Sequence, residues 1–169
     1  FFTDIFNSMS KRIFHRGPDH SGKWHDNNFG INFAHQRLSI LELSMSGNQP
    51  MKSQSGRYVI TFNGEIYNHL ELRQILEDKK LISKDWNSKS DTETILACIE
   101  AYGIEEAVKK FVGMFAFAIW DRKFKELYLV RDRFGEKPLF WGLLNSKINF
   151  KNNSIFTSDL PILFFASEL

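Results

Sequence analysis

The sequence predicts an α+β fold in which two packed, mainly antiparallel sheets are covered by helices. Three observations predict this class: an apolar helical stripe within residues 2–13, turn-bounded strand-like runs at 31–40 and 58–62, and a doubly apolar strand at 113–120. The chain has 169 residues, of which 43% are hydrophobic, so it is long enough to bury a core.

The first predicted element is an amphipathic helix. Its apolar residues recur at helical spacing and would form one stripe against the core. A helix end is expected near residues 15–18, at a Gly-Pro pair. The stripe consists of Phe2, Ile5, Phe6, Met9 and Ile13.

The next predicted elements are strands at 31–40 and 58–62, which carry the β-branched and aromatic residues that are typical of strands. Clusters of turn-forming residues bound them at 26–28, 44–48 and 63–64.

Two helices are predicted from capping signals. Ser90 and Glu93 have the spacing of a capping box, in which each side chain satisfies a backbone N–H of the other residue, and Gly103 ends that helix. Asn68 and Glu71 mark a weaker start of the same kind.

The segment 113–120 is apolar on both of its alternating faces, so as a strand it has to be central in its sheet. Residues 125–130 follow after a turn at 121–123, and an antiparallel hairpin is the simplest connection. The stretch 145–163, rich in Asn, Ser and Lys, predicts an extended last hairpin without a function that the sequence indicates.

Charge and cysteine usage exclude several classes of partner and site. Lys plus Arg number 22 and Asp plus Glu 20, so no nucleic acid or membrane surface is expected to bind. Neither a membrane span nor a signal peptide is recognisable. A single cysteine, Cys98, excludes an intrachain disulfide and fits a reducing, cytoplasmic location. The five histidines lack metal-binding spacing, so no metal site is predicted.

Five polar clusters lie at the ends of these elements, where chemistry is usually displayed. Taken singly, each is explained as a turn, a helix cap or a surface ion pair. Their order and spacing along the chain make them specific. They are His15-Arg16-Gly17-Pro18-Asp19, His35-Gln36-Arg37-Leu38-Ser39-Ile40, Phe62-Asn63-Gly64-Glu65-Ile66-Tyr67-Asn68, Ser90-Asp91-Thr92-Glu93 and Arg131-Asp132-Arg133-Phe134-Gly135-Glu136-Lys137-Pro138-Leu139.

Together, the clusters resemble the glutaminase half of glutamine-hydrolysing asparagine synthetases, which are class II glutamine amidotransferases of the N-terminal-nucleophile hydrolase superfamily. The resemblance covers nearly the whole chain, including Gln49-Pro50-Met51 and the closing 165–169. It implies a four-layer αββα sandwich. It also implies that 1–169 is one amidotransferase domain, truncated at its N-terminus and lacking the synthetase domain.

In this family the nucleophile is a cysteine at residue one, whose α-amino group serves as the base. The chain does not contain it, and Phe1-Phe2 resembles positions that follow the family's Cys-Gly-Ile-Ala-Gly opening. Cys98 is not a substitute, because its helix presents that side to the core, where a thiol is inert. We expect Met-Cys-Gly upstream of Phe1 if the intact protein is an enzyme.

The resemblance implies roles for the residues that are present. Asn63, through its side-chain amide, and Gly64, through its backbone N–H, match the two donors of the oxyanion hole. Arg37 matches the residue that holds the α-carboxylate of glutamine with two parallel hydrogen bonds. Glu65 and Asp91 match the acids that hold its α-ammonium.

Other residues have open roles. Leu38 and Ile40 either shape the pocket beside Arg37 or form ordinary strand core. Arg131 and Asp132, with Lys137, are either scaffold or part of the face toward the synthetase domain.

The implied function is hydrolysis of glutamine to glutamate and ammonia, which the full-length enzyme uses for ATP-dependent amidation of aspartate to asparagine. No cofactor is expected in this domain, whereas ATP and Mg²⁺ are expected in the missing one. The expected partners are glutamine, the C-terminal synthetase domain and a second copy in a homodimer. Alternatives are a paralogue that amidates another carboxylate, a non-catalytic amidotransferase-like module and, ranked last, an unrelated two-sheet binding protein.

Overall fold

The computed structural model describes residues 2–38, 45–82, 85–144, 148–149, 155–156 and 161–168. The chain divides into two compact units, 1–137 and 138–169, each with its own sheets. That the whole of 1–169 acts as one domain stays a prediction.

Unit 1 (1–137) contains all of the helices in the described part of the chain. The helices are α1 (Phe2–Arg12), α2 (His69–Asp78), α3 (Asp91–Tyr102) and α4 (Ile104–Lys110), with short 3₁₀ turns at Phe14–Arg16 and Met45–Gly47. The strands are β1 (His20–Asp26), β2 (Ile31–Arg37), β3 (Met51–Lys52), β4 (Tyr58–Ile66), β5 (Gly113–Asp121) and β6 (Glu126–Arg131).

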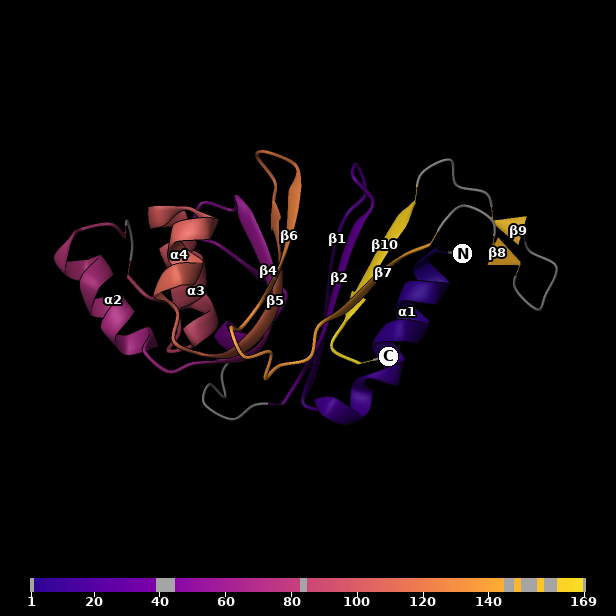
Figure 1. Ribbon diagram of the computed structural model, residues 1–169, viewed down its shortest axis with the longest axis horizontal. Coiled ribbons are helices and arrows are strands. Elements are labelled where there is room, and N and C mark those ends of the chain that lie inside the picture. Colours follow the sequence, from indigo (N-terminus) through magenta and orange to yellow (C-terminus); the bar gives the residue numbers. More distant parts are fainter. Residues whose placement is uncertain are drawn as a thin grey trace. The chain divides into compact units, whose positions relative to one another are not determined.

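The elements of unit 1 form four layers (Figure 1). Helices α2, α3 and α4 cover one face of the antiparallel sheet β3-β4-β5-β6. The β1-β2 hairpin lies against the other face, where Phe29 of its turn packs on Trp120 with ring centroids 5.9 Å apart. Helix α1 covers the far side of β2, and Gln36 Nε2 donates to Ser10 Oγ at 3.1 Å. The predicted αββα order is therefore confirmed in unit 1.

The alternation of side chains along β4 explains why both faces of this strand are covered. Ile60 and Phe62 point to the helices and join Ile95 of α3 in the main core. Residues of the opposite parity, which include Asn63 and Glu65, point to the β1-β2 layer. The fold thereby places these two polar residues between the sheets.

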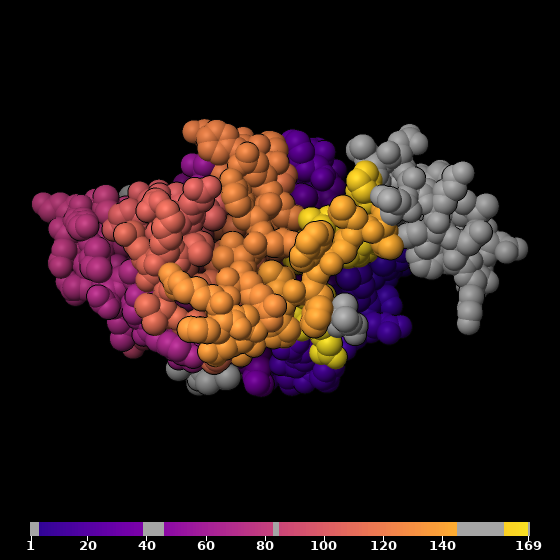
Figure 2. All heavy atoms as spheres, viewed as in Figure 1, coloured from indigo at the N-terminus to yellow at the C-terminus, as the bar shows by residue number. Residues whose placement is uncertain are grey.

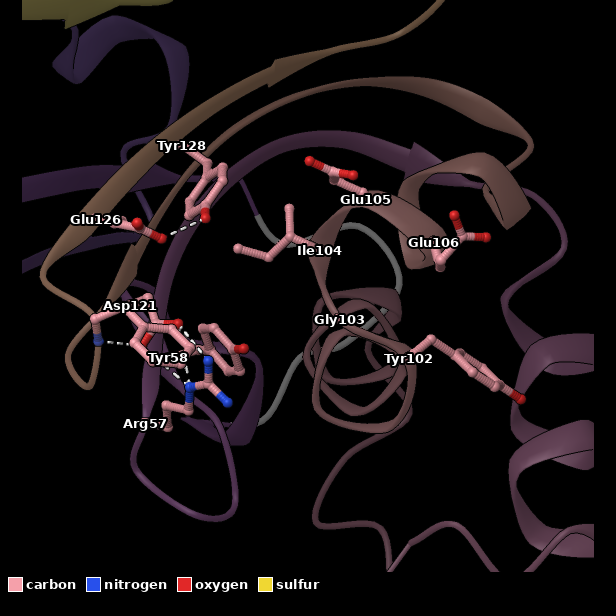
Figure 3. Close-up of a pocket in the computed structure, with 11 residues that line it drawn as sticks. Arg57, Tyr58, Tyr102, Gly103, Ile104, Glu105, Glu106, Asp121, Glu126 and Tyr128 are labelled. Carbon is pink, nitrogen blue, oxygen red and sulfur yellow. Dashed lines mark hydrogen bonds and ion pairs between the residues drawn. The ribbon is translucent and has the colours of Figure 1, made fainter.

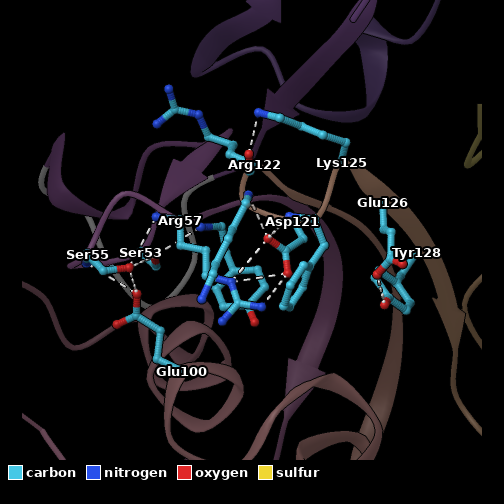
Figure 4. Close-up of polar contacts among 12 residues, drawn as sticks. Ser53, Ser55, Arg57, Glu100, Asp121, Arg122, Lys125, Glu126 and Tyr128 are labelled. Atoms are coloured by element: carbon cyan, nitrogen blue, oxygen red, sulfur yellow. Dashed lines mark hydrogen bonds and ion pairs between the residues drawn. The ribbon is translucent and has the colours of Figure 1, made fainter.

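Strand β5 is central, as its doubly apolar sequence predicts, because β4 and β6 pair with its two edges. The predicted hairpin to β6 is also confirmed. At the turn, the Arg57 guanidinium donates to the Asp121 carboxylate, with Nη2 and Oδ2 2.6 Å apart (Figure 4). Burial alone would raise the pKa of Asp121. The hydrogen bonds from Arg57 and from the N–H groups of Phe124 and Lys123, together with the charge of Arg57, outweigh burial and lower that pKa. This pair ties the start of β4 to the end of β5.

Five elements differ from the sequence prediction. β3 was not predicted, and β4 continues through residues 63–64, where a turn was predicted, to Ile66, because pairing with β5 extends over the whole segment. β1 was not predicted, because its sequence lacks alternation and contains Gly22. A Cβ on Gly22 would lie 1.8 Å from the Gln49 carbonyl oxygen, so close packing between segments requires this glycine. β2 ends at Arg37, short of the predicted residue 40, and the short helix α4 was missed.

The loop before α3 corrects the predicted capping box. Ser90 caps the helix as expected, since its hydroxyl accepts from the Thr92 N–H at 3.1 Å. Glu93 does not return to the Ser90 N–H. Its carboxylate accepts instead from the N–H groups of Asn87 and Ser88, at 2.9 and 2.8 Å, and so holds the preceding loop.

The other helix ends agree with the sequence in position but not always in mechanism. Gly103 ends α3 with a φ of 79°, as predicted. Asn68 precedes α2, but its side chain makes no cap hydrogen bond. Its Oδ1 accepts from the Val112 N–H and its Nδ2 donates to the Lys110 carbonyl, both at 3.0 Å, so it joins α2 to the segment before β5.

The loop 131–137 is built around Asp132, which confirms the scaffold interpretation of this motif. The Asp132 carboxylate accepts hydrogen bonds from the backbone N–H groups of Phe115, Phe134, Glu136 and Lys137 at 3.0 to 3.2 Å. Burial alone would raise the pKa of Asp132, but these hydrogen bonds outweigh it and lower the pKa to about 2.

Unit 2 (138–169) consists of antiparallel strand pairs. β7 (Phe140–Leu144) pairs with β10 (Ile162–Ala166), and β8 (Ile148–Asn149) pairs with β9 (Ile155–Phe156). In the sequence, the pair β8-β9 lies between β7 and β10, which agrees with the predicted extended hairpin. Most of 145–160 lies outside the described residues. In the described part of the chain, no helix is both long and apolar enough to cross a membrane.

Candidate functional site

The backbone N–H predicted as an oxyanion donor lies on the edge of β4 that faces away from β5. The N–H and C=O of Phe115 in β5 are bonded to Asp132, on the β6 side. In an antiparallel pair, the residue opposite Phe115 must then direct its own N–H and C=O away from β5. That residue is Gly64.

Along this edge, side-chain oxygens accept hydrogen bonds from the backbone N–H groups on either side of Gly64. The Phe62 N–H donates to Gln49 Oε1 at 2.6 Å, and the Ile66 N–H donates to Asp91 Oδ2 at 3.0 Å. No acceptor from the described residues is hydrogen bonded to the Gly64 N–H between them. The backbone therefore presents one unused donor between two that are occupied.

Only glycine fits at position 64. Its φ is +148°, a conformation that residues with a side chain rarely adopt. A Cβ there would lie 2.2 Å from the Met114 carbonyl oxygen and 2.7 Å from Phe115 Cα. The close approach of β5 and the backbone conformation thus both require the glycine that the family motif contains.

The Asn63 side chain supplies a second donor next to this N–H. Its Nδ2 is buried and lacks a hydrogen-bond partner among the described residues. A buried polar group without a partner costs about 1–3 kcal/mol, so its retention favours a ligand that uses it. A backbone N–H and a side-chain amide on adjacent residues are the elements from which an oxyanion hole is built.

Arg37 lies at the end of β2 on the face directed toward the β3-β6 sheet. His35 has the same parity, and its Nε2 contacts the Phe62 carbonyl oxygen at 3.1 Å, which defines the direction of that face. Arg37 is 9% exposed, and its Nη1 donates to Asn48 Oδ1 at 2.7 Å. Arg37 and Asn63 therefore both point into the space between the sheets.

Burial lowers the pKa of His35 to about 4, so this imidazole is neutral and its Nε2 donates.

The two predicted acids, Glu65 and Asp91, lie close to each other at the end of β4. Asp91 accepts from the N–H of Ile66, the neighbour of Glu65. Burial raises the pKa of Asp91, and the negative charge of Glu65 adds to this effect. A cationic group placed between the carboxylates would offset both the burial of the Asp91 charge and its repulsion by Glu65. His69 is beside them, but burial lowers its pKa and so disfavours its charged form.

Of the two apolar residues with open roles, Leu38 and Ile40, the structure decides only that the first is not strand core. Leu38 is 55% exposed, so it is not strand core as one of the two interpretations held. Ile40 lies outside the described residues. The residues brought together at this end of β4 and the start of α3 are thus Asn63, Gly64, Glu65 and Asp91. Arg37 is linked to them through residues 48–49.

Cys98 is buried in α3, as its helical position predicts. Burial raises the pKa of its thiol to about 12, so the thiolate does not form near neutral pH. Among the described residues, no group of three or more His, Cys, Asp or Glu side chains could hold a metal ion.

A surface cavity of about 520 Å³ lies elsewhere in unit 1. Figure 3 shows it between β6 and the α3-α4 turn, with Tyr128 and Ile104 among its lining residues. On the face drawn in Figure 2, these two elements lie side by side. The cavity also contacts Tyr58 and Asp121, at the end of the sheet opposite to Asn63, so it is separate from the candidate site.

Sequence reasoning missed two residues that contact this site, Asn48 and Gln49. Asn48 is the last residue of a predicted turn cluster and Gln49 follows it, and polar side chains in turns are ordinarily directed to water. No local signal indicates that Gln49 is 8% exposed and bonded to two distant segments.

Comparisons with known proteins agree with this geometry. The family model for the glutamine amidotransferase domain matches residues 2–168. Asparagine synthetase [glutamine-hydrolyzing] 1 of Bacillus subtilis (strain 168) is 44% identical over 147 residues, which are 87% of this chain and 22% of that protein. Amidase chry2 of Gibberella zeae is 35% identical over 137 residues, 80% of this chain and 20% of that protein.

A solved structure agrees as well. Glutamine phosphoribosylpyrophosphate amidotransferase from B. subtilis superposes with a TM-score of 0.55 and 25% identity, over 66% of this chain and 25% of that one. The chain thus spans about a fifth of the length of the relatives named here. Since the family model covers nearly every residue and the synthetase relative is 44% identical, this chain belongs to the glutamine amidotransferase domain family.

Proposed function

We propose that this chain is the glutaminase domain of a glutamine-hydrolysing asparagine synthetase. The observation that carries the proposal is the pair of unused donors, the Gly64 N–H and the buried Asn63 amide, next to two carboxylates. These groups match what hydrolysis of a glutamine side chain requires: stabilisation of the tetrahedral oxyanion and recognition of the amino-acid end.

Each residue has a separate task in this proposal. Arg37 binds the α-carboxylate of glutamine, and Glu65 with Asp91 binds the α-ammonium. A ligand that lacks either charge is rejected, because a buried charged group would stay unpaired. Asn63 and Gly64 then donate to the carbonyl oxygen as it gains negative charge during attack by a thiolate.

The thiolate has to come from a residue other than Cys98. We expect a purified protein of residues 1–169 to release no glutamate from glutamine above background, since its one thiol is buried and protonated. Joining the family's Cys-Gly-Ile-Ala-Gly opening ahead of Phe1 should produce hydrolysis, measured as glutamate release. Robust release from residues 1–169 would contradict the assignment. No release from the cysteine-led protein would favour a non-catalytic module instead.

Substitution of Arg37 by lysine is expected to weaken glutamine binding. Lysine keeps the charge but loses the planar fork that binds a carboxylate at two points, so the KM for glutamine should rise about 10 to 100-fold with a smaller change in kcat. The readout is glutaminase kinetics of the cysteine-led enzyme.

A matched arginine provides the control for this substitution. Arg57 also binds a carboxylate, that of Asp121, but at the far end of the sheet. Arg57→Lys should therefore lower the melting temperature and leave the KM for glutamine unchanged. If Arg37→Lys behaves in the same way, Arg37 has a structural role only.

Asp91→Asn is expected to separate function from stability. It removes a charge that binds the ammonium in ground state and transition state alike, so KM should rise while kcat changes less. Folding should not suffer, because burial raises the pKa of Asp91 and its charged form opposes folding. The amide oxygen of asparagine can still accept the Ile66 N–H.

The sign of the pH dependence follows from the raised pKa of Asp91. The folded chain holds the proton of the Asp91 carboxyl more tightly than the unfolded chain does, so protonation of Asp91 stabilises the fold. This stabilisation is complete below the unfolded pKa of about 3.9. It is lost as the pH rises through the folded pKa. The melting temperature of Asp91→Asn relative to wild type should therefore increase between pH 4 and 7. A decrease over that range would make Asp91 a stabilising cap acid.

The use of the ammonia belongs to the rest of the longer protein. We propose ATP- and Mg²⁺-dependent amidation of aspartate there, because the relative with 44% identity is an asparagine synthetase. Relatives of this domain also carry other names, such as the amidase with 35% identity, so the second candidate is amidation of a carboxylate other than aspartate. Glutamine-dependent product formation with aspartate, compared with other carboxylic acids, distinguishes the two in the full-length enzyme.

A further inference from the structure

The dipeptide Asn48-Gln49 contacts three separate parts of the candidate site. The segment follows the 3₁₀ turn Met45–Gly47 and precedes β3. Its two side chains reach the end of β2, the edge of β4 and the start of α3. None of these contacts follows from a neighbouring position in the sequence, since the partners lie 11, 13 and 43 residues away.

Gln49 acts on the oxyanion donors through the backbone of β4. Its Oε1 accepts from the Phe62 N–H at 2.6 Å, one residue before Asn63 and two before Gly64. β3 pairs only with Val59 and Ile60, so it stops before this point, and no other strand among the described residues pairs with this edge of β4. The Gln49 side chain therefore replaces a neighbouring strand where the donors begin.

The other end of the Gln49 amide is also bonded. Its Nε2 donates to Thr92 Oγ1 at 3.3 Å, in the residue that follows Asp91. Gln49 and Thr92 are 8% and 2% exposed, so the connection is shielded from water. One amide thus links the backbone before the oxyanion donors to the helix turn that carries an ammonium-binding acid.

Asn48 acts on the carboxylate clamp. Its Oδ1 accepts from Arg37 Nη1 at 2.7 Å, and so it orients the guanidinium that the proposed function assigns to the α-carboxylate. The backbone of the dipeptide is itself closely held, because the Gln49 carbonyl oxygen would lie 1.8 Å from a Cβ on Gly22. The two side chains therefore project from a tightly packed segment.

We propose that Asn48 and Gln49 are positioning residues of the glutaminase site: Gln49 sets the oxyanion donors, and Asn48 sets the arginine that binds the α-carboxylate. The inference rests on the proposed function. It assigns different kinetic consequences to these two adjacent residues. Loss of Gln49 should mainly lower kcat, because Gln49 acts on groups used in the transition state, and loss of Asn48 should mainly raise KM, because Asn48 acts on ground-state binding.

The test uses the full-length, cysteine-led enzyme and glutaminase kinetics. Gln49→Leu removes both amide contacts at similar volume, and kcat should fall about 10 to 100-fold with a smaller change in KM, as expected when reacting groups are displaced. Asn48→Ala should raise KM about 10-fold with a smaller change in kcat. Ammonia-dependent synthesis should be unchanged in both variants. Gln74→Leu, at an exposed glutamine of α2, is the matched control and should change neither parameter.

A second pair of variants tests the connection without altering Gln49. Thr92→Val keeps the volume and removes the acceptor, so kcat should fall several-fold, whereas Thr92→Ser keeps the hydroxyl and should restore it. Equal kcat values in the two threonine variants, or unchanged kcat in a folded Gln49→Leu enzyme, would overturn the proposal for Gln49. An unchanged KM in Asn48→Ala would overturn it for Asn48.

The same measurements distinguish this inference from the proposed function. Suppose that Asn63→Ala lowers kcat and Arg37→Lys raises KM as expected, but the variants of residues 48, 49 and 92 change neither parameter. Then only the positioning roles are wrong. If Asn63→Ala and Arg37→Lys also leave glutamine hydrolysis unchanged, the assignment of the site itself is wrong.

Discussion

Asn63→Ala is expected to lower the kcat for glutamine hydrolysis about 100 to 1000-fold, with a much smaller effect on KM. The amide would stabilise charge that exists only in the transition state, so its loss should not weaken binding of the ground state. The structure adds an expectation for stability. Because Asn63 Nδ2 is buried without a partner among the described residues, removing it should leave the free energy of unfolding unchanged or raise it by about 1 kcal/mol.

The measurement combines glutaminase kinetics with thermal unfolding of the cysteine-led enzyme. Asn32→Ala is the matched control, since Asn32 is an exposed asparagine of β2 whose Nδ2 donates to the Gly30 carbonyl. It should not change kcat. If Asn63 were only a turn residue before Gly64, its replacement would lower the melting temperature and affect turnover only through the folded fraction. A folded Asn63→Ala enzyme with unchanged kcat would refute the assigned role.

Gly64→Ala is expected to destabilise the protein by about 3 to 5 kcal/mol, because strain in the backbone and overpacking against β5 add to each other. The φ of +148° disfavours any side chain, and the new Cβ would lie 2.2 Å from the Met114 carbonyl oxygen. Backbone of a central strand cannot move aside as a flexible side chain can. The midpoint of urea unfolding should therefore fall strongly, and hydrolysis should be lost in the cysteine-led enzyme.

Gly30→Ala separates the two causes. Gly30 also has a positive φ, of 65°, but a Cβ there would meet nothing within 4 Å. This change should cost only the conformational strain, about 1 to 2 kcal/mol. Equal destabilisation by the two substitutions would mean that the contact with β5 does not require a glycine at position 64.

Much of the fold could be predicted from the sequence, because burial leaves a periodic pattern. The apolar stripe predicts α1, and the doubly apolar run predicts that β5 lies between two strands. β1 was missed because Gly22 and its polar neighbours carry no such pattern. It is a strand because β2 pairs with it, and that pairing is a property of the assembled sheet.

The candidate site divides in the same way. The motifs identified Asn63, Gly64 and Asp91, and the structure places all three at one end of β4. The resemblance named the Gly64 N–H as a donor, but the local pattern alone could not, because an unused N–H depends on the strand pairing of Phe115 and on where β3 stops.

By itself, the sequence determined the family, the main helices and strands, and the residue types that the site requires. Only the tertiary structure decided that Glu93 holds the loop before α3, that Leu38 is exposed, and that Gln49 links β4 to α3. The physical reason is that propensity and periodicity reflect each residue's local backbone and its burial. A hydrogen bond between segments 43 residues apart leaves no trace in either, since it forms only when the layers pack.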